Sequence, residues 1–462
     1  MKLISSKLCI PKLSKEIYLF FYFIFAIIFF PFCIINSNVN FLLMFSIIEC
    51  LLFSIYLYKD SETISFVFLF WVISHFFNLS ILFIPEDNEF GVLLPYVAHD
   101  LNENNVFITV IYVFLCHFLF SLGCVVSNIC RYNEVSLKRK KMHNIIKVAK
   151  ILIILGIIPK LFLVYKYFTL FLSGSYYKVV KYTPNGIFYF ISTLVDVGLL
   201  LLISCNLSLK NKSKYIILYI FFQVFFAIVG KRGTAISNII ALVIVICANK
   251  KINLVKLFKI FLVSLLVLFL VVLISQYRGL SSDSREDFFS DFFSKSNILL
   301  YIIYFACSEF GSAFLTICYS IMYLSNVHSW GINYFIGAFT IIPTTSSISQ
   351  LVNKISGYKN LFPMKTNIGG SYIGETFYSF SWLGIFVFLV YGFCINFISK
   401  LVINEMKAKY KSYAFFIIPM LSYLTWWIRD YFSPLWRPFF WTVLLILIID
   451  FFLKYSKEVS YK

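Results

Sequence analysis

Long apolar runs recur from one end of the chain to the other, and they restrict the possible folds more than any other feature of the sequence. A helix needs about 20 apolar residues to cross a hydrocarbon core of ~30 Å. Of the 462 residues, 60% are hydrophobic and 13% are charged, which is too little polar surface to enclose one soluble core. The sequence therefore predicts an all-α, polytopic integral membrane protein with about 12–14 transmembrane helices in one multispan domain, residues 1–462.

The candidate spans follow one another along the whole chain, and two of them are weak. The eighth is short, and the eleventh has a proline and a polar second half, so a broken or re-entrant helix is an alternative to a crossing. No small-residue cleavage site follows the first run, so we expect it to be retained as a helix. The spans lie near residues 16–36, 40–58, 63–85, 105–127, 145–170, 186–208, 215–230, 234–249, 257–276, 298–325, 331–350, 382–403, 412–428 and 437–453.

Lysine gathers in alternate loops and predicts the orientation of the chain. It is concentrated in the amino-terminal segment, in the loop after the fourth span (RYNEVSLKRKKMHN), in KNKSK and KAKYK, and in the carboxyl-terminal tail. Cationic loops resist translocation, so both termini are expected in the cytoplasm. The formal net charge of +19 is mostly this topogenic lysine together with attraction to anionic lipid, and it predicts no nucleic-acid partner.

Arginine shows the opposite distribution. Unlike lysine, it presents a flat fork of donors that binds phosphate or carboxylate through two hydrogen bonds, and it keeps its charge. The pattern predicts an anion site at the outer surface, and snorkelling to headgroups or a loop ion pair is the alternative for any single arginine. Five of the seven arginines fall in or beside loops that the lysine pattern places outside: Arg232, Arg278, Arg285, Arg429 and Arg437.

The segment VGKRGTAISN, residues 229–238, places Lys231 and Arg232 in a short outer turn between two apolar spans. The flanking glycines permit a tight turn, and Thr234 is expected to cap the helix that follows. Free backbone donors and the helix dipole would add to the two side-chain charges, which suits a diphosphate at the membrane surface. An ordinary charged hairpin is the alternative interpretation.

Two longer outer loops are expected, at about 277–297 and 351–381. The first has phenylalanines on one helical face, as in an interfacial amphipathic helix, and its aspartates, spaced by four, indicate a solvated helix face more than a cation site. The second combines paired glycines, hydroxyls and aromatic rings, a composition suited to binding carbohydrate. Its candidate sugar-contacting residues are Gly369, Gly370, Tyr372 and Tyr378.

Several chemistries have no motif in the sequence. There is no Asp-x-Asp pair for a metal-held sugar nucleotide, no phosphate loop, no dinucleotide glycine fingerprint and no His-Glu-x-x-His. The 11 cysteines stand singly, without a Cys-x-x-Cys pair, so we expect them to be small apolar packing residues. We therefore expect no metal and no cofactor, and neither ATP nor a sugar nucleotide as a direct substrate.

Taken together, these features resemble a known family. The GKRG turn, an outer YRG after the ninth span and the stretch GGSYIGETFYSFSWLG look like the Wzy-type O-antigen polymerases, which join oligosaccharide repeat units. The resemblance covers most of the chain. Glu375 and Tyr378 match the acid and the aromatic residue of that family near this place, whereas SFSWLG replaces the usual Asn-Phe-Gly. The resemblance implies a GT-C-like helical membrane fold and a metal-independent glycosyltransferase of the bacterial inner membrane.

The resemblance also implies the reaction. A growing glycan on undecaprenyl diphosphate would be transferred to the non-reducing end of a lipid-linked repeat unit at the outer face of the membrane. Candidate partners are the lipid-linked glycans, the bilayer, a chain-length regulator and the repeat-unit flippase. The alternatives are an O-antigen ligase, a polysaccharide flippase or transporter, and a non-catalytic scaffold. The residues expected to stabilise charge on the leaving diphosphate are Arg232, Arg278, Arg285, Arg429 and Lys231.

The acceptor hydroxyl of such a reaction needs a general base or an orienting acceptor. The candidates are Glu375, then Asp430, and Glu309 inside the tenth span, because an acid in hydrocarbon is costly and usually faces a cavity or a partner. A structural pairing with a lysine or a hydroxyl is the alternative for Glu309. The same pairing is the preferred interpretation for Glu49 and Asp196.

Overall fold

The computed structural model of the chain consists of helices and their connections, and the residues that it describes contain no β-strand. Six helices are apolar and long enough to cross a membrane, which confirms the prediction of an all-α polytopic membrane protein. The structure describes residues 15–35, 38–60, 62–76, 103–129, 142–172, 178–179, 182, 184–205, 207–248, 273, 313–339, 370–408 and 413–460.

The helix bounds agree with the predicted spans to within two helical turns for most of the described chain. Of the predicted span 257–276 only residue 273 is described, residues 340–350 of the eleventh lie outside the described residues, and what is described of the eleventh is the eight-residue α13. The labelled α-helices are α1 (Lys15–Ile35), α2 (Val39–Asp60), α3 (Glu62–Phe76), α4 (Glu103–Ile129), α5 (Met142–Leu172), α7 (Gly186–Ser204), α8 (Leu209–Ile228), α9 (Arg232–Ala248), α13 (Ile332–Phe339), α15 (Tyr372–Phe380), α16 (Gly384–Lys407), α17 (Met420–Trp427) and α18 (Phe432–Ser460). A further apolar helix, Ala313–Leu324, is the described part of the predicted tenth span.

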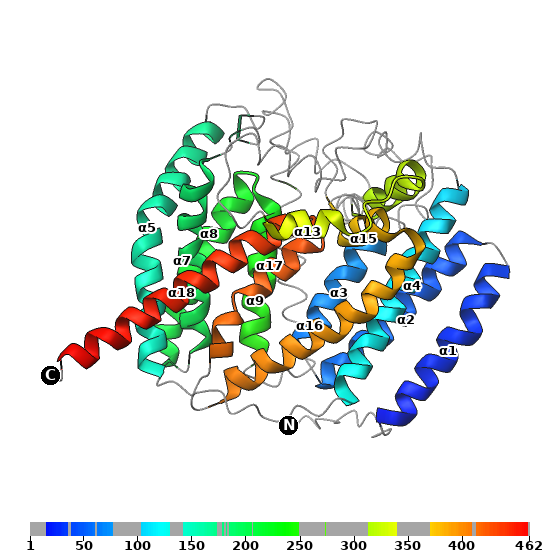
Figure 1. Ribbon diagram of the computed structural model, residues 1–462, viewed down its shortest axis with the longest axis horizontal. Coiled ribbons are helices and arrows are strands. Elements are labelled where there is room, and N and C mark those ends of the chain that lie inside the picture. Colours follow the sequence, from blue (N-terminus) through cyan, green and yellow to red (C-terminus); the bar gives the residue numbers. More distant parts are fainter. Residues whose placement is uncertain are drawn as a thin grey trace, which may run out of the picture.

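The helices form two packed groups. One contains α1 to α4 with α16, and the other contains α5, α7, α8 and α9, against which α17 and α18 pack. Contacts of α3 with α9 join the two groups. In Figure 1, α1 and α5 lie at opposite rims, α13 and α15 lie toward the upper side, and α18 runs from that side to the lower left.

Close approach of helix backbones holds each group together. A Cβ atom added to Gly123 of α4 would collide with the carbonyl group of Leu389 in α16, and one added to Gly392 of α16 would collide with Phe120 in α4. Gly156 of α5 makes the same kind of contact with α7. Lipid chains are as apolar as leucine, so small residues that let helices approach are a main source of association energy in a membrane.

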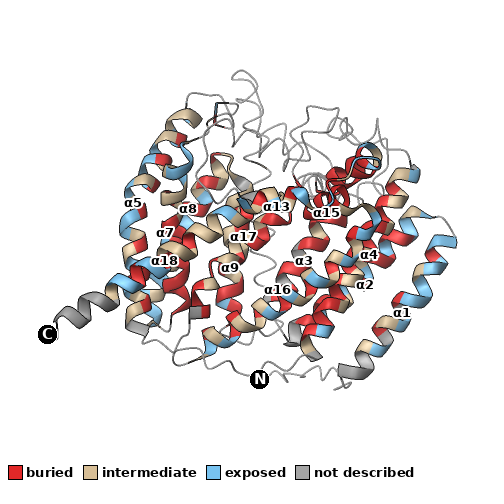
Figure 2. Cartoon of the chain, viewed as in Figure 1, coloured by how far each residue is buried: buried red, intermediate tan, exposed pale blue. Residues whose placement is uncertain are grey.

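Burial separates the interior of these groups from their outer faces. Figure 2 shows exposed residues on the outer sides of α1 and α5, and these include large apolar side chains such as Ile27 and Ile158. An apolar outer surface suits contact with lipid. The buried acid Glu49 accepts hydrogen bonds from the Tyr22 hydroxyl and the Cys50 thiol, so the structural pairing with a hydroxyl that we predicted for it is confirmed.

Part of the second predicted outer loop, residues 351–381, forms a helix in the structure. Residues 372–380 form the helix α15, and all but the last of them are buried. Ser371 caps this helix, because its hydroxyl oxygen accepts from the backbone N–H of Ile373. This part of the predicted outer loop is therefore a packed helix, whose Tyr372 ring contacts α3, α16 and α17. Residues 351–369 lie outside the description, as does the first predicted loop, 277–297.

Candidate functional site

The turn between α8 and α9 is as tight as predicted. Gly230 has a φ of 107°, a conformation that side chains disfavour, and the N–H of Lys231 donates to the Phe226 carbonyl at 2.8 Å. The N–H of Gly230 donates to Ala227, and the two bonds form a Schellman motif that closes α8. This motif places Lys231 directly before α9, which starts at Arg232.

Thr234 does not cap α9, and that prediction is wrong. The helix begins two residues earlier, and the Thr234 hydroxyl donates to the Lys231 carbonyl at 3.1 Å. A threonine in the first turn of a helix can bond back to the preceding turn. Thr234 is therefore a side chain on the surface of α9, and its oxygen is still able to accept a hydrogen bond.

Gly233 has a different role from Gly230. A Cβ atom on Gly233 would overlap the indole of Trp426 in α17, so this glycine lets the ring lie directly on α9. The Trp426 indole N–H donates to Asp430 Oδ2 at 3.0 Å, and the backbone N–H of Tyr431 donates to Asp430 Oδ1 at 3.0 Å. The backbone of Asp430 also lies against Gly370, where a Cβ atom would collide with it. Asp430 is thus held from several sides.

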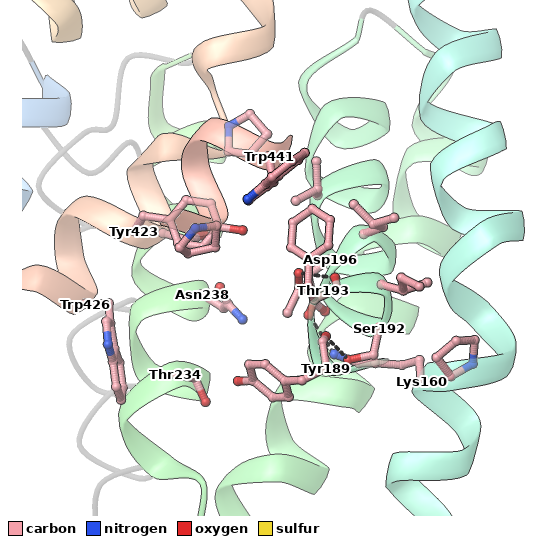
Figure 3. A pocket seen from close by; sticks show the side chains of 18 of the residues that line it. Lys160, Tyr189, Ser192, Thr193, Asp196, Thr234, Asn238, Tyr423, Trp426 and Trp441 are labelled. Atoms are coloured by element: carbon pink, nitrogen blue, oxygen red, sulfur yellow. Dashed lines mark hydrogen bonds and ion pairs between the residues drawn. The ribbon is translucent and has the colours of Figure 1, made fainter. Parts of the chain in front are cut away.

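A cavity of about 1260 Å³ lies between α5, α7, α8, α9, α17 and α18. Lys231 and Asp430, both predicted site residues, line it together, and so does Arg437, one of the outward arginines of the sequence. Figure 3 shows the labelled side chains around this space, from α5, α7, α9, α17 and α18. We call it the chamber. Its aromatic lining includes Tyr167, Tyr189, Tyr423, Trp426 and Trp441.

The cations of the chamber differ in their surroundings. Lys231 Nζ lies over the ring of Tyr167, 5.4 Å from its centroid, and partial burial lowers the pKa of its ammonium group. Arg437 is on the first turns of α18 and exposed. Lys160 of α5 is buried and forms an ion pair of 2.6 Å with Asp196 of α7, which confirms the structural pairing predicted for Asp196.

Two amides extend the ion pair across the chamber wall. Gln223 Nε2 of α8 donates to Asp196 Oδ1 at 2.9 Å, and Asn238 Nδ2 of α9 donates to Gln223 Oε1 at 2.9 Å. Neither amide was predicted from the sequence to be a site residue. The signal was present, because a polar side chain inside an apolar span usually faces a partner or a cavity.

Glu375 lies elsewhere, fully buried in α15. Its Oε1 accepts from Asn333 Nδ2 at 3.1 Å, and its Oε2 accepts from the backbone N–H of Phe432 at 2.8 Å. The Ser329 and Ser379 hydroxyls donate to Asn333 Oδ1 at 2.5 and 2.9 Å. Glu375 does not line the chamber. Its contacts connect α13 and α15 to the start of α18, two residues after Asp430.

The predicted sugar-contacting tyrosines are packing residues in this structure. Tyr372 is fully buried, with its ring 4.9 Å from Trp71 and 5.4 Å from Trp427 between centroids. Tyr378 is 8% exposed and packs with Tyr319. Neither lines the chamber.

The remaining predicted site residues are placed only in part. Arg429 is half-buried just after α17 and is not in the chamber lining, and of Arg232 the backbone alone is described. Within the described ranges, no three His, Cys, Asp or Glu residues lie close enough to hold a metal ion. The following residues lie outside the description: Gly369, Arg278, Arg285, Glu309 and the aspartates Asp283, Asp287 and Asp291.

Fold and chamber together define a polytopic helical membrane protein with an internal site that can hold an amphiphilic substrate carrying an anionic group. The sequence model of one family, the O-antigen polysaccharide polymerase Wzy, matches residues 18–458, nearly the whole chain. The chain belongs to this family, so it is a multi-pass bacterial membrane protein and a glycosyltransferase-type polymerase acting on lipid-linked glycans. No curated protein and no solved structure matches it.

Proposed function

We propose that the protein lengthens O-antigen by moving a growing glycan from undecaprenyl diphosphate to the non-reducing end of a lipid-linked repeat unit. The reaction takes place in the chamber. The observation that carries this proposal is that Lys231 lines one cavity with Asp430 and Arg437, although about 200 residues separate the two segments.

In this reaction the two cations hold the leaving group. The bond between the anomeric carbon of the donor glycan and the diphosphate oxygen breaks, and negative charge grows on that diphosphate. Preorganised cations near the growing charge stabilise the transition state more than the ground state. Lys231 and Arg437 supply this charge, and Arg232 adds to it at the start of α9, where free backbone N–H groups also favour anions.

Asp430 receives the acceptor. The acceptor hydroxyl oxygen forms the new bond to the anomeric carbon, and its proton passes to the Asp430 carboxylate. Two N–H donors, the Trp426 indole and the Tyr431 backbone, hold this carboxylate in the chamber wall and orient it there. Glu375, the first candidate from the sequence, does not line the chamber, and its oxygens accept from Asn333 and Phe432 outside it. We propose a positioning role for it.

The chamber faces the outer leaflet of the inner membrane in this proposal, with both chain termini in the cytoplasm. The lysine pattern supports this orientation. The arrangement in Figure 1 also supports it, since α1 begins and α18 ends on the side opposite to α13 and α15. Diphosphate would lie near the α8–α9 turn, at the level of the headgroups, with its lipid chain in the bilayer.

Deletion of the gene tests the proposal in a strain that makes long surface glycan. A lipid core bearing one repeat unit supports a polymerase, whereas a bare core indicates the ligase or flippase alternative. In the complemented strain, Lys231→Ala and Arg437→Ala are each expected to slow elongation about tenfold, because solvent screens part of each charge. Gel analysis of the glycan ladder measures this. Lys214→Ala, at the exposed amino-terminal end of α8, is the matched control.

The outer arginines of the sequence give a separate prediction. Arg232→Ala and Arg278→Ala are expected to yield a one-unit ladder at normal protein levels, and the Arg→Lys variants are expected to restore elongation in part, because lysine keeps the charge but not the donor fork. Immunoblots of membranes give the protein levels. Unchanged ladders in both alanine variants would remove these arginines from the diphosphate site.

A further inference from the structure

The wall of the chamber contains a row of hydrogen-bonded polar side chains, and the charge at one end determines which group donates and which accepts in each bond. Asp196 carries a carboxylate that can only accept, so it accepts from Lys160 and from the Gln223 amide nitrogen. Gln223 then presents its oxygen to Asn238, which donates its own amide nitrogen. The ion pair therefore determines the orientation of both amides.

The direction of these hydrogen bonds determines which amide atoms Asn238 presents to the chamber. One N–H of its amide is used by Gln223, so the second N–H and the oxygen Oδ1 remain. Within the part of the chain that the structure describes, nothing donates to Asn238 Oδ1. An acceptor and a donor side by side match a hydroxyl group, which both donates and accepts. Figure 3 shows Asn238 projecting from α9 toward the side chains of α7.

The depth of Asn238 indicates a polar occupant. It lies six residues after Arg232 in α9, or about 9 Å along the helix, below the level proposed for the diphosphate. A lipid chain at this depth would cover the free amide atoms without pairing them, which is unfavourable. A hydroxyl-rich group would pair them instead.

Neighbouring side chains complete a surface of the kind that binds sugar. Thr234 lies one turn before Asn238 on the same face of α9, and its oxygen can accept because its proton is donated to Lys231. The rings of Tyr423 and Trp441 line the same space from α17 and α18. Aromatic rings offer apolar faces to a pyranose ring while polar side chains bind its hydroxyls.

We propose that Asn238 and Thr234 form a subsite for one sugar ring of the lipid-linked glycan, and that Lys160, Asp196 and Gln223 are positioning residues that orient the Asn238 amide. The inference rests on the proposed function and adds a specificity element to it. The ion pair, which is structural in itself, acts here through the amide that it orients.

Steady-state kinetics of the purified full-length protein test this, with the lipid-linked repeat unit isolated from the deletion strain. Asn238→Ala is expected to raise the KM for the repeat unit about tenfold and to leave kcat within about twofold, since binding is lost without loss of the reacting groups. Gln223→Ala is expected to raise KM in the same direction. Asn211→Ala, at the exposed start of α8, is the matched control and should leave KM unchanged.

Thr234→Val serves as the second variant, because among the described residues its hydroxyl bonds only to the carbonyl of Lys231, just before its own helix. It is expected to raise KM as well, and it decides the matter if Asn238→Ala does not fold. An unchanged KM in whichever of the two variants folds overturns the subsite. If the wild-type protein polymerises the repeat unit in the same assay, the proposed function is unaffected by that result. A wild-type protein that does not polymerise the repeat unit contradicts the proposed function itself.

Discussion

Asp430→Asn is expected to slow polymerisation by about 100-fold or more, with normal amounts of protein in the membrane. Asparagine has nearly the same shape, and its amide oxygen can still accept from the Trp426 indole or the Tyr431 backbone. Because this side chain is only half-buried, unlike Glu375, water can accept from the other donor. It cannot take the proton of the acceptor hydroxyl. Initial rates of chain growth on isolated repeat units measure the effect, and the glycan ladder of the complemented strain should collapse toward one unit.

Two variants accompany this experiment. Glu405→Gln, an acid near the far end of α16, should leave the rate unchanged. Glu375→Gln separates the two candidate acids. It places an amide donor against either the Phe432 N–H or the Asn333 amide. We therefore expect it to reduce the stability of the protein more than the turnover per folded molecule. A normal rate in Asp430→Asn together with a 100-fold loss per folded Glu375→Gln molecule would assign the base to Glu375.

Gly123→Leu in α4 and Gly392→Leu in α16 are each expected to remove most of the folded protein. The Cβ position of either glycine lies against the backbone of the opposite helix, so no change of side-chain rotamer can relieve the overlap. Overpacking of a core typically costs about 1–3 kcal/mol and more where the backbone must move. The two helices would have to separate, and the contacts between α4 and α16 would be lost.

Size-exclusion chromatography of the detergent-solubilised protein checks this. The measured quantity is the fraction of protein that elutes in a single symmetric peak. Gly186→Ala is the control, because no atom lies within 4 Å of a Cβ added there. A normal profile for both leucine variants would mean that α4 and α16 are farther apart in the membrane than in this structure.

Helical spans could be predicted from the sequence because each depends on local composition. A run such as 145–170 must become a helix in lipid, where every backbone group needs a partner within its own segment. The helix α5, Met142–Leu172, follows that run closely. The tight turn at Gly230 was predicted for the same reason, since its requirement for glycine is local.

Contacts between distant segments could not be predicted in this way. Lys231 and Asp430 were both singled out as site residues, but the sequence did not indicate that they share a chamber with Arg437 and Asn238. Glu375 and Tyr372 lie in a stretch that resembles the family, and tertiary packing places both in the interior. Which face of a helix meets which neighbour depends on the shapes of all the packed helices.

The sequence by itself determined that this protein is a multispan helical membrane protein of the Wzy family. The length of its apolar runs and the pattern of the family are both properties of the linear sequence and need no tertiary contact. Only the tertiary structure decided which cations, acids and amides line one chamber. These groups come from five helices and the turns that join them, and their distances follow from close packing of helix faces, a property of many residues at once.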